Sequence, residues 1–307
     1  MFLSPAAMHI PDGFLSLPVV LVGWGLTLSL LAAALRRANA ASQLPLMGVL
    51  AAFIFAAQAI NFPVAAGASG HLIGGALAAI LLGPWQGMLT MTAVVTVQAL
   101  VFQDGGLVAL GWNLFNMGGL ACFAGDLVYR RLGALQARRA RAAAFLAGWV
   151  SVMVAATAAS LQLAVSGTVA VGLVLPAMLG VHALIGIGEG LISAGAVAFL
   201  RGAQPTVMAR PAGAPGNRRT AYLLLGLGLA LLLTPLASGF PDGLERVAQR
   251  LAFDAKATAL GIGLLNDYAL PGVSSPALST ALAVALGAAL LAGLGWLMAR
   301  ALARSQS

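Results

Sequence analysis

Residues 17–35 read LPVVLVGWGLTLSLLAAAL, and Arg36 and Arg37 follow directly. No side chain in this run is charged, and a helix of this length rises about 28 Å. The hydrocarbon core of a bilayer is about 30 Å thick. We therefore predict a transmembrane helix whose arginine end is cytoplasmic, because Lys and Arg accumulate in cytoplasmic loops.

Similar apolar runs recur along the whole chain of 307 residues, of which 61% are hydrophobic and only 8% are charged. About a quarter of the residues of a soluble domain are charged. Helices satisfy their backbone hydrogen bonds internally, so we expect an all-α polytopic membrane protein. The further runs cover residues 45–60, 72–82, 88–102, 107–129, 142–165, 171–200, 222–236 and 278–297.

Composition excludes several other classes. The net charge of +8 comes from basic residues that lie between apolar runs, so it indicates membrane topology and not nucleic-acid binding. Cys122 is the single cysteine, so no disulfide framework is possible. No G-x-x-x-x-G-K-[ST] motif is present, so any ATP hydrolysis must come from another subunit. We expect no removable signal peptide, because no basic segment with a small-residue cleavage site precedes the first run.

The short run 72–82 decides the topology. Eleven residues are too few to cross a core of about 30 Å as an ordinary helix. However, counting this run as a crossing places the arginine-rich segments 130–141, 201–219 and 300–304 in the cytoplasm. Nine crossings then put the N-terminus outside and the C-terminus inside. Met8, His9, His71 and the loop 237–276 all face outward in this arrangement.

The segment before the first run, Met8-His9-Ile10-Pro11-Asp12-Gly13-Phe14, has the chemistry of a metal chelate. If the chain begins at Met8, its amine and the His9 amide close a five-membered ring on a metal. The same amide and His9 Nδ1 close a six-membered ring. Square-planar nitrogen sites favour Ni(II) or Cu(II), with Co(II) close behind, and His71 is the candidate for the fourth corner. A solvated histidine without a metal is the plain alternative.

Residues 1–7 stand before this segment, and an internal Met8 has no free amine. We therefore expect residues 1–7 to be a misassigned or removed extension.

Ionisable residues inside a span are candidates for function. Asp126 lies one turn before Arg130, and an i,i+4 ion pair is the interpretation that we favour. His182 and Glu189 lie seven residues apart on one helix face, where we expect a structural or coupling role ahead of direct metal ligation. Several other polar residues could orient the metal ligands through hydrogen bonds, or could cap helix ends. They are Asp12, Asn61, Ser69, Asn113 and Asn116.

Several motifs resemble one family, the cobalt/nickel substrate-capture permeases of energy-coupling factor transporters. They are Met-His-Ile-Pro-Asp-Gly-Phe-Leu at 8–15, Asn-Phe-Pro-Val at 61–64, Ser-Gly-His-Leu-Ile-Gly-Gly at 69–75, Leu-Gly-Pro-Trp at 82–85, Gln-Asp-Gly-Gly at 103–106, Asn-Leu-Phe-Asn-Met-Gly at 113–118 and His-Ala-Leu-Ile-Gly-Ile-Gly-Glu at 182–189.

This resemblance implies a seven-helix capture bundle over residues 8–200, with a metal held by Met8, His9 and His71. It also implies two kinds of partner, a transmembrane coupling subunit and cytoplasmic ATPases. Phe-Pro-Asp-Gly-Leu-Glu at 240–245 resembles a small accessory subunit. We therefore expect a cytoplasmic linker at 201–219 and an accessory domain at 220–304, with two transmembrane helices and the outer loop 237–276.

The expected function is capture of Ni(II) or Co(II) outside the cell for ATP-driven uptake, without a catalytic cofactor. The nitrogen set accepts both metals, so the sequence does not separate them. Two rival functions stay open. One is an intramembrane metal-dependent hydrolase that uses His71, His182 and Glu189. The other is a capture subunit for an organic, vitamin-like ligand, which predicts an aromatic-lined pocket that does not depend on His9.

Overall fold

The computed structural model describes residues 9–38, 43–65, 67–132, 137–203, 224–225, 227–228, 231–234, 237–258, 260–261 and 263–305. Met8, residues 1–7, residues 204–219 of the linker and part of the predicted span 222–236 lie outside the described residues. The described part is mostly helical, with one two-stranded sheet, β1 (Phe62–Pro63) antiparallel to β2 (Ser69–Gly70). The all-α prediction is confirmed.

Each predicted run that the structure describes forms helix. The first runs become α1 (Leu17–Arg37), α2 (Leu44–Gln58), α3 (Gly75–Leu82) and α4 (Pro84–Val97), and α4 continues as a π-helical segment, η2 (Gln98–Phe102). The run 107–129 becomes α5 (Leu110–Leu114), η3 (Phe115–Leu120) and α6 (Ala121–Arg131). The last runs become α7 (Ala137–Val165), α8 (Val171–Ala203) and α11 (Pro276–Ser305).

Among the described residues, five helices are long and apolar enough to cross a membrane: Leu17–Arg37, Pro84–Phe102, Arg139–Val165, Val171–Leu200 and Pro276–Met298. Their outer faces carry exposed leucines. On α11, for example, Leu278, Leu282, Leu286 and Leu290 are exposed at four-residue intervals. Such a stripe on a helix is suited to contact with lipid. The predicted count of seven plus two helices stays a prediction.

The short run 72–82 forms α3, an eight-residue helix buried inside the bundle. It packs against α4, α6 and α7. The residues before it, 71–74, are not helical. Non-helical backbone at membrane depth needs protein partners for its N–H groups. Glu189 on α8 supplies them for Ile73 and Gly74, as described below.

Small residues bring helices into close contact at several places in the bundle. A Cβ added at Gly190 on α8 would lie 2.7 Å from Cδ2 of Phe145 on α7. The contact of α2 and α11 is equally close, because a Cβ added at Gly48 would lie 2.9 Å from Cα of Gly295. Both contacts therefore require the absence of a side chain.

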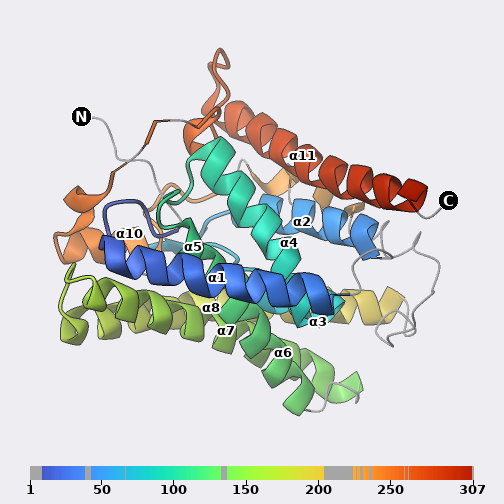
Figure 1. The fold of residues 1–307 in the computed structure, drawn as a ribbon, viewed down its shortest axis with the longest axis horizontal. Helices are drawn as coiled ribbons and strands as arrows, with labels where there is room; N and C mark the ends of the chain where they lie inside the picture. The colour runs from blue at the N-terminus through green and yellow to red at the C-terminus, as the bar shows by residue number, and fades with distance from the viewer. Residues whose placement is uncertain are drawn as a thin grey trace.

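The segment 237–276, predicted as a loop, contains the helix α10 (Gly243–Arg250) and two 3₁₀ turns, η6 (Asp254–Lys256) and η7 (Asn266–Tyr268). Asp242 forms the N-cap of α10, and its side chain accepts a hydrogen bond from the N–H of Glu245. In Figure 1, α10 lies at the end of the bundle where α1 begins, and α11 crosses α2 and α4 toward the C-terminus.

Candidate metal centre

The segment that follows Met8 is buried in the bundle, and Asn113 of α5 holds it there. Asn113 Oδ1 accepts a 3.1 Å hydrogen bond from the N–H of Ile10, and Asn113 Nδ2 donates a 3.0 Å bond to the Ile10 carbonyl. The N–H of Gly106 also donates to this carbonyl. His9 is 4% exposed. Asn113 therefore fixes the backbone next to His9.

Asp12 holds the same segment from its other end. Its two carboxylate oxygens accept hydrogen bonds from the N–H groups of Leu107, at 3.0 Å, and Ala109, at 2.9 Å. These groups lie directly before α5, and a carboxylate is favourable at a helix N-terminus. The Asp12 carbonyl also accepts a bond from the N–H of Thr258. The N-terminal segment therefore lies between α5 and the C-terminal module, which comprises the described residues between 237 and 305.

His9 pairs with Asp104, a residue of the Gln-Asp-Gly-Gly motif at 103–106. His9 Nδ1 lies 2.9 Å from Asp104 Oδ1. Burial alone would lower the pKa of His9, but the Asp104 carboxylate outweighs burial and raises it. Burial alone would raise the pKa of Asp104, and the pairing with His9 lowers it instead. His9 Nε2 is buried without a hydrogen-bond partner.

A chain of buried hydrogen bonds continues from Asp104 to the backbone beside His71. Tyr268 Oη donates to Asp104 Oδ2 at 2.7 Å, and Gln98 Nε2 lies 3.2 Å from Tyr268 Oη. Gln98 Nε2 also donates to Gln58 Oε1 at 2.9 Å. Gln58 Nε2 completes the chain with a 2.7 Å bond to the Ile73 carbonyl. The two candidate histidine ligands are therefore positioned by one network.

His71 follows β2 and stands beside His9, with 5.7 Å between the ring centroids. Its Nδ1 lies 2.9 Å from the Leu72 carbonyl oxygen and donates to it. Nε2 is then the ring nitrogen with a lone pair. It lies 3.7 Å from Oδ2 of Asp242, a residue of the C-terminal module. The structure thus brings together the two histidines that the sequence proposed as ligands.

Glu189 positions the backbone that carries His71. It is fully buried on α8, and its two carboxylate oxygens accept hydrogen bonds from the N–H groups of Ile73, at 2.6 Å, and Gly74, at 2.9 Å. This arrangement agrees with a structural role for Glu189.

A small cavity of about 70 Å³ lies between the two histidines and the C-terminal module. His182 lines it, although His182 Nδ1 donates to the Met178 carbonyl of its own helix at 2.8 Å. Asn116 also lines it and forms a reciprocal amide pair with Gln162. Within the described ranges, no three His, Cys, Asp or Glu side chains are grouped closely enough to hold a metal ion.

Ser69 and Asn61 bind the C-terminal module and not the histidine rings. The N–H of Ser69 donates to the Pro241 carbonyl at 2.8 Å, and Ser69 Oγ donates to the Phe240 carbonyl at 2.7 Å. The main-chain carbonyl of Asn61 accepts a 2.7 Å bond from the N–H of Ser238, whereas its side-chain Oδ1 is buried without a hydrogen-bond partner. These contacts hold the Pro-Asp-Gly segment beside His71.

Sequence reasoning placed Asp242 in the outer loop 237–276, on the same side as the two histidines, but did not predict its contact with His71, and it gave Tyr268 no role. Burial raises the pKa of Asp242 to about 7, and the nearby Asp104 carboxylate adds to the increase. One sequence signal could have pointed to Asp242. Pro-Asp-Gly occurs twice, at 11–13 and 241–243, and each copy places its aspartate at the start of a helix beside the candidate site.

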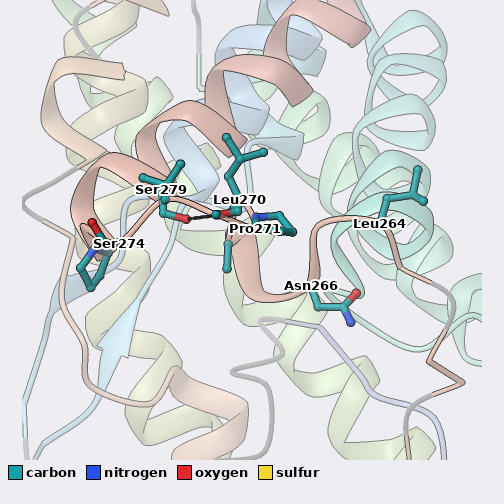
Figure 2. A pocket seen from close by; sticks show the side chains of 10 residues that line it. Leu264, Asn266, Leu270, Pro271, Ser274 and Ser279 are labelled. Atoms are coloured by element: carbon teal, nitrogen blue, oxygen red, sulfur yellow. Dashed lines mark hydrogen bonds between the residues drawn. The ribbon is translucent and has the colours of Figure 1, made fainter.

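A larger pocket of about 560 Å³ lies between residues 264–276 and the start of α11. Figure 2 shows it, with Ser279 Oγ hydrogen-bonded to the backbone of Leu270. The described residues that line it include no aromatic and no ionisable side chain. It therefore lacks the aromatic lining that the organic-ligand hypothesis predicts.

Asp126 is paired with Arg130, as expected, with 2.7 Å between Asp126 Oδ2 and Arg130 Nε. This pair and the arginines at the ends of α1 and α6 lie on helix ends distinct from the histidine site.

The chain matches two families of known proteins. Residues 9–207 match the cobalt uptake substrate-specific transmembrane region, and residues 217–304 match the PDGLE domain. A putative fused nickel transport protein of Archaeoglobus fulgidus is 39% identical over 95% of this chain and 98% of its own length. A fused nickel transport protein of Rhodobacter capsulatus is 29% identical over 94% of this chain and 96% of its own length.

A cobalt transport protein of Geobacter sulfurreducens is 33% identical over 80% of this chain and 78% of its own length. Two crystal structures are also similar, each at 30% sequence identity. A transition metal transporter superimposes with a TM-score of 0.58 over 63% of this chain and 92% of that chain. A truncated transition metal transporter gives 0.57 over 62% and 97%.

Proposed function

Because the chain belongs to the family of cobalt uptake substrate-specific transmembrane proteins, and carries a PDGLE domain, we propose that it captures Ni(II) or Co(II) outside the cell. It is a metal transport protein and not an enzyme. More specifically, we propose that the chain is the substrate-capture subunit of an energy-coupling factor importer.

The observation that carries this proposal is the meeting of His9 and His71. Their rings lie 5.7 Å apart by centroid, although 62 positions separate them in the chain. Both rings are buried, and they line the same small cavity. With a free amine at Met8, the donors are this amine, the His9 amide, the His9 imidazole and the His71 imidazole. Four nitrogens in a plane suit Ni(II), and Co(II) is the next candidate.

The surrounding residues hold the proposed metal ligands in position. Asn113 and Asp12 hold the N-terminal segment, and Glu189 holds the backbone after His71. A rigid support of this kind lowers the entropic cost of binding. His9 Nδ1, the nitrogen of the proposed chelate ring, is paired with Asp104. Metal binding through Nδ1 therefore requires this pair to separate.

We further propose that a transmembrane coupling subunit and cytoplasmic ATPases drive the inward step. The sequence contains no phosphate-binding motif of its own. The protein would be a multi-pass protein of the cell membrane with its N-terminus outside. The positive-inside rule supports this orientation, because Arg36, Arg37, Arg130 and Arg131 end their helices away from the histidine site.

Metal analysis of the purified full-length protein tests the capture function. Inductively coupled plasma mass spectrometry should find about one Ni or Co per chain after growth with either metal, as a single four-nitrogen site requires. Cells that express the chain together with its genomic coupling and ATPase partners should accumulate radioactive nickel or cobalt. If the protein binds neither metal, the capture function is contradicted. If it binds metal but needs no partners for uptake, only the ATP-driven part of the proposal is contradicted.

A further inference from the structure

The helix α1 is held to the bundle along one narrow face. Lipid tails are as apolar as leucine, so hydrophobic burial does not fix a transmembrane helix against its neighbours. Close packing of small residues and hydrogen bonds between helices do so instead. The position of α1 therefore depends on its few buried residues, which are Val19, Val20, Gly23, Thr27 and Ala34.

Trp112 of α5 contacts α1 in two ways. Its indole N–H donates a 2.6 Å hydrogen bond to the Val19 carbonyl. Its ring lies against Gly23, where an added Cβ would be 2.5 Å from Cδ1 of the indole. Position 23 must therefore lack a side chain for the ring to take this place.

The contact is reciprocal, because α1 also places a tryptophan beside α5. The indole N–H of Trp24 donates a 3.0 Å hydrogen bond to the Val108 carbonyl. Gly111 leaves room for the α1 backbone, since an added Cβ would lie 2.8 Å from the main-chain nitrogen of Trp24. Thr27 Oγ1 donates a hydrogen bond to the Gly111 carbonyl. Each helix therefore supplies a tryptophan and also the glycine that accommodates its neighbour.

The same short helix α5 holds the segment that supplies His9. Asn113, the residue after Trp112, is bonded to both the N–H and the carbonyl of Ile10. The helix α5 has only five residues, and it lies between the non-helical residues 103–109 and the π-helical segment η3. A helix this short has little stability of its own. Its position, and with it that of His9, therefore depends on α1.

We infer that Trp112 is a positioning residue of the metal site, which holds α5 against α1 so that Asn113 keeps the His9 segment in place. This inference rests on the proposed function. Trp112 itself supplies no donor to the ion. Without its contact to α1, the segment occupies the binding-competent position for only part of the time, and the apparent affinity for the metal falls by that fraction.

Trp112→Phe removes the N–H group and keeps an aromatic ring against Gly23. Calorimetric titration of the full-length protein with Ni(II) should show an affinity about fivefold lower, because one hydrogen bond is lost. Trp149→Phe is the matched control, whose affinity should stay at the wild-type value. The indole N–H of Trp149 on α7 likewise donates a 3.0 Å bond, to the Ala183 carbonyl of α8, and its ring packs on Gly186.

A second pair of variants tests the same contact from α1. Gly23→Ala places a methyl group against the Trp112 indole, so the ring must move. Gly25→Ala changes the same helix two residues further on, where an added Cβ meets nothing within 4 Å. Both variants replace glycine by alanine within one helix, so their intrinsic effects on helix stability are alike. The Ni(II) affinity should fall in Gly23→Ala and stay unchanged in Gly25→Ala.

Two further measurements separate positioning from stability and from ligation. Thermal unfolding without added metal should show equal losses for Trp112→Phe and Trp149→Phe, because each variant loses one hydrogen bond between helices. X-ray absorption of the bound Ni(II) should show the same nitrogen donors in Trp112→Phe as in the wild type.

Wild-type affinity in both Trp112→Phe and Gly23→Ala would overturn the inference, even if both variants are less stable. An equal fall of affinity in Trp149→Phe would overturn it as well, because general loosening of the bundle would then explain the loss. A changed set of donors in Trp112→Phe would also contradict it, since positioning alone leaves the donors as they are. If the wild-type chain binds neither Ni(II) nor Co(II), the proposed function itself has failed.

Discussion

Tyr268 Oη donates a 2.7 Å hydrogen bond to Asp104 Oδ2, although 164 residues separate the two side chains in the sequence. The ring of Tyr268 stacks on Phe102, with centroids 4.7 Å apart and an interplanar angle of 16°. The C-terminal module therefore holds Asp104 from one side while His9 pairs with it from the other.

This relationship predicts the effect of Tyr268→Phe. The variant removes a hydrogen bond to a buried carboxylate, so the free energy of unfolding should fall by about 2 kcal/mol. Tyr129→Phe is the control, because the hydroxyl of Tyr129 is buried without a partner and its loss should cost about nothing. Thermal unfolding in detergent compares the two. Equal destabilisation by both variants would contradict the prediction.

His71→Ala should abolish tight metal binding without unfolding the bundle. The substitution removes one of four nitrogen donors, and the backbone at this position is held by Glu189 through Ile73 and Gly74. Calorimetric titration with Ni(II) and with Co(II) measures the loss. His182→Ala is the control, since His182 lines the same cavity but its Nδ1 is bonded to its own helix. Unchanged affinity in His71→Ala would exclude the four-nitrogen site.

Metal affinity should fall with decreasing pH, beginning above the ordinary histidine pKa of about 6.5. Although burial opposes it, Asp104 raises the pKa of His9, so the ring takes up a proton more readily. The His9–Asp104 pair stabilises the fold fully below pH 6.5, and this contribution is lost as pH rises through the raised pKa. Metal needs the neutral ring, so binding has the opposite dependence.

Calorimetry between pH 6 and pH 8 measures this dependence, and Asp104→Asn should move its onset to lower pH. An onset that is the same in both proteins would show that Asp104 does not control the protonation of His9.

Glu189→Gln should loosen the backbone that carries His71. A neutral amide offers a single oxygen to the two N–H groups that the carboxylate now satisfies, so one buried donor loses its partner. The expected cost is about 1–3 kcal/mol in the free energy of unfolding. Metal affinity should fall as well, because His71 is no longer held in place. Wild-type stability together with wild-type affinity would contradict this role.

The functional chain should begin at Met8. An upstream peptide would convert the amine into an amide, and the amine, with a pKa of about 7.7–8.0, is accessible to metal near neutral pH. Intact mass spectrometry and Edman sequencing of the native protein determine the start. A mature protein that keeps residues 1–7 and binds nickel tightly would overturn the proposed set of donors.

Much of the fold follows from local patterns. Long apolar runs predicted α1, α7, α8 and α11, because a helix satisfies its own backbone hydrogen bonds in lipid. The pairing of His9 with His71 came from the motif resemblance and the small number of histidines. The helix α10 was missed, because its eight residues mix polar and apolar side chains and lie in a segment rich in turns.

The neighbours of the histidines were not predictable in the same way. Asp242 and Tyr268 reach the site through the docking of a module more than 160 residues away in the chain. No periodicity in the sequence encodes that contact. Glu189 was recognised as unusual, but its partners are backbone N–H groups, which carry no signature in a sequence.

The contact of Gly48 with Gly295 places two helices from distant parts of one polypeptide backbone to backbone. Since α2 and α11 belong to the same chain, a transient separation of this contact leaves them covalently linked, so that binding again is an intramolecular event. Dilution in the plane of the membrane therefore does not dissociate the two parts. Translation fixes their stoichiometry, and every His71 is synthesised together with its own Asp242.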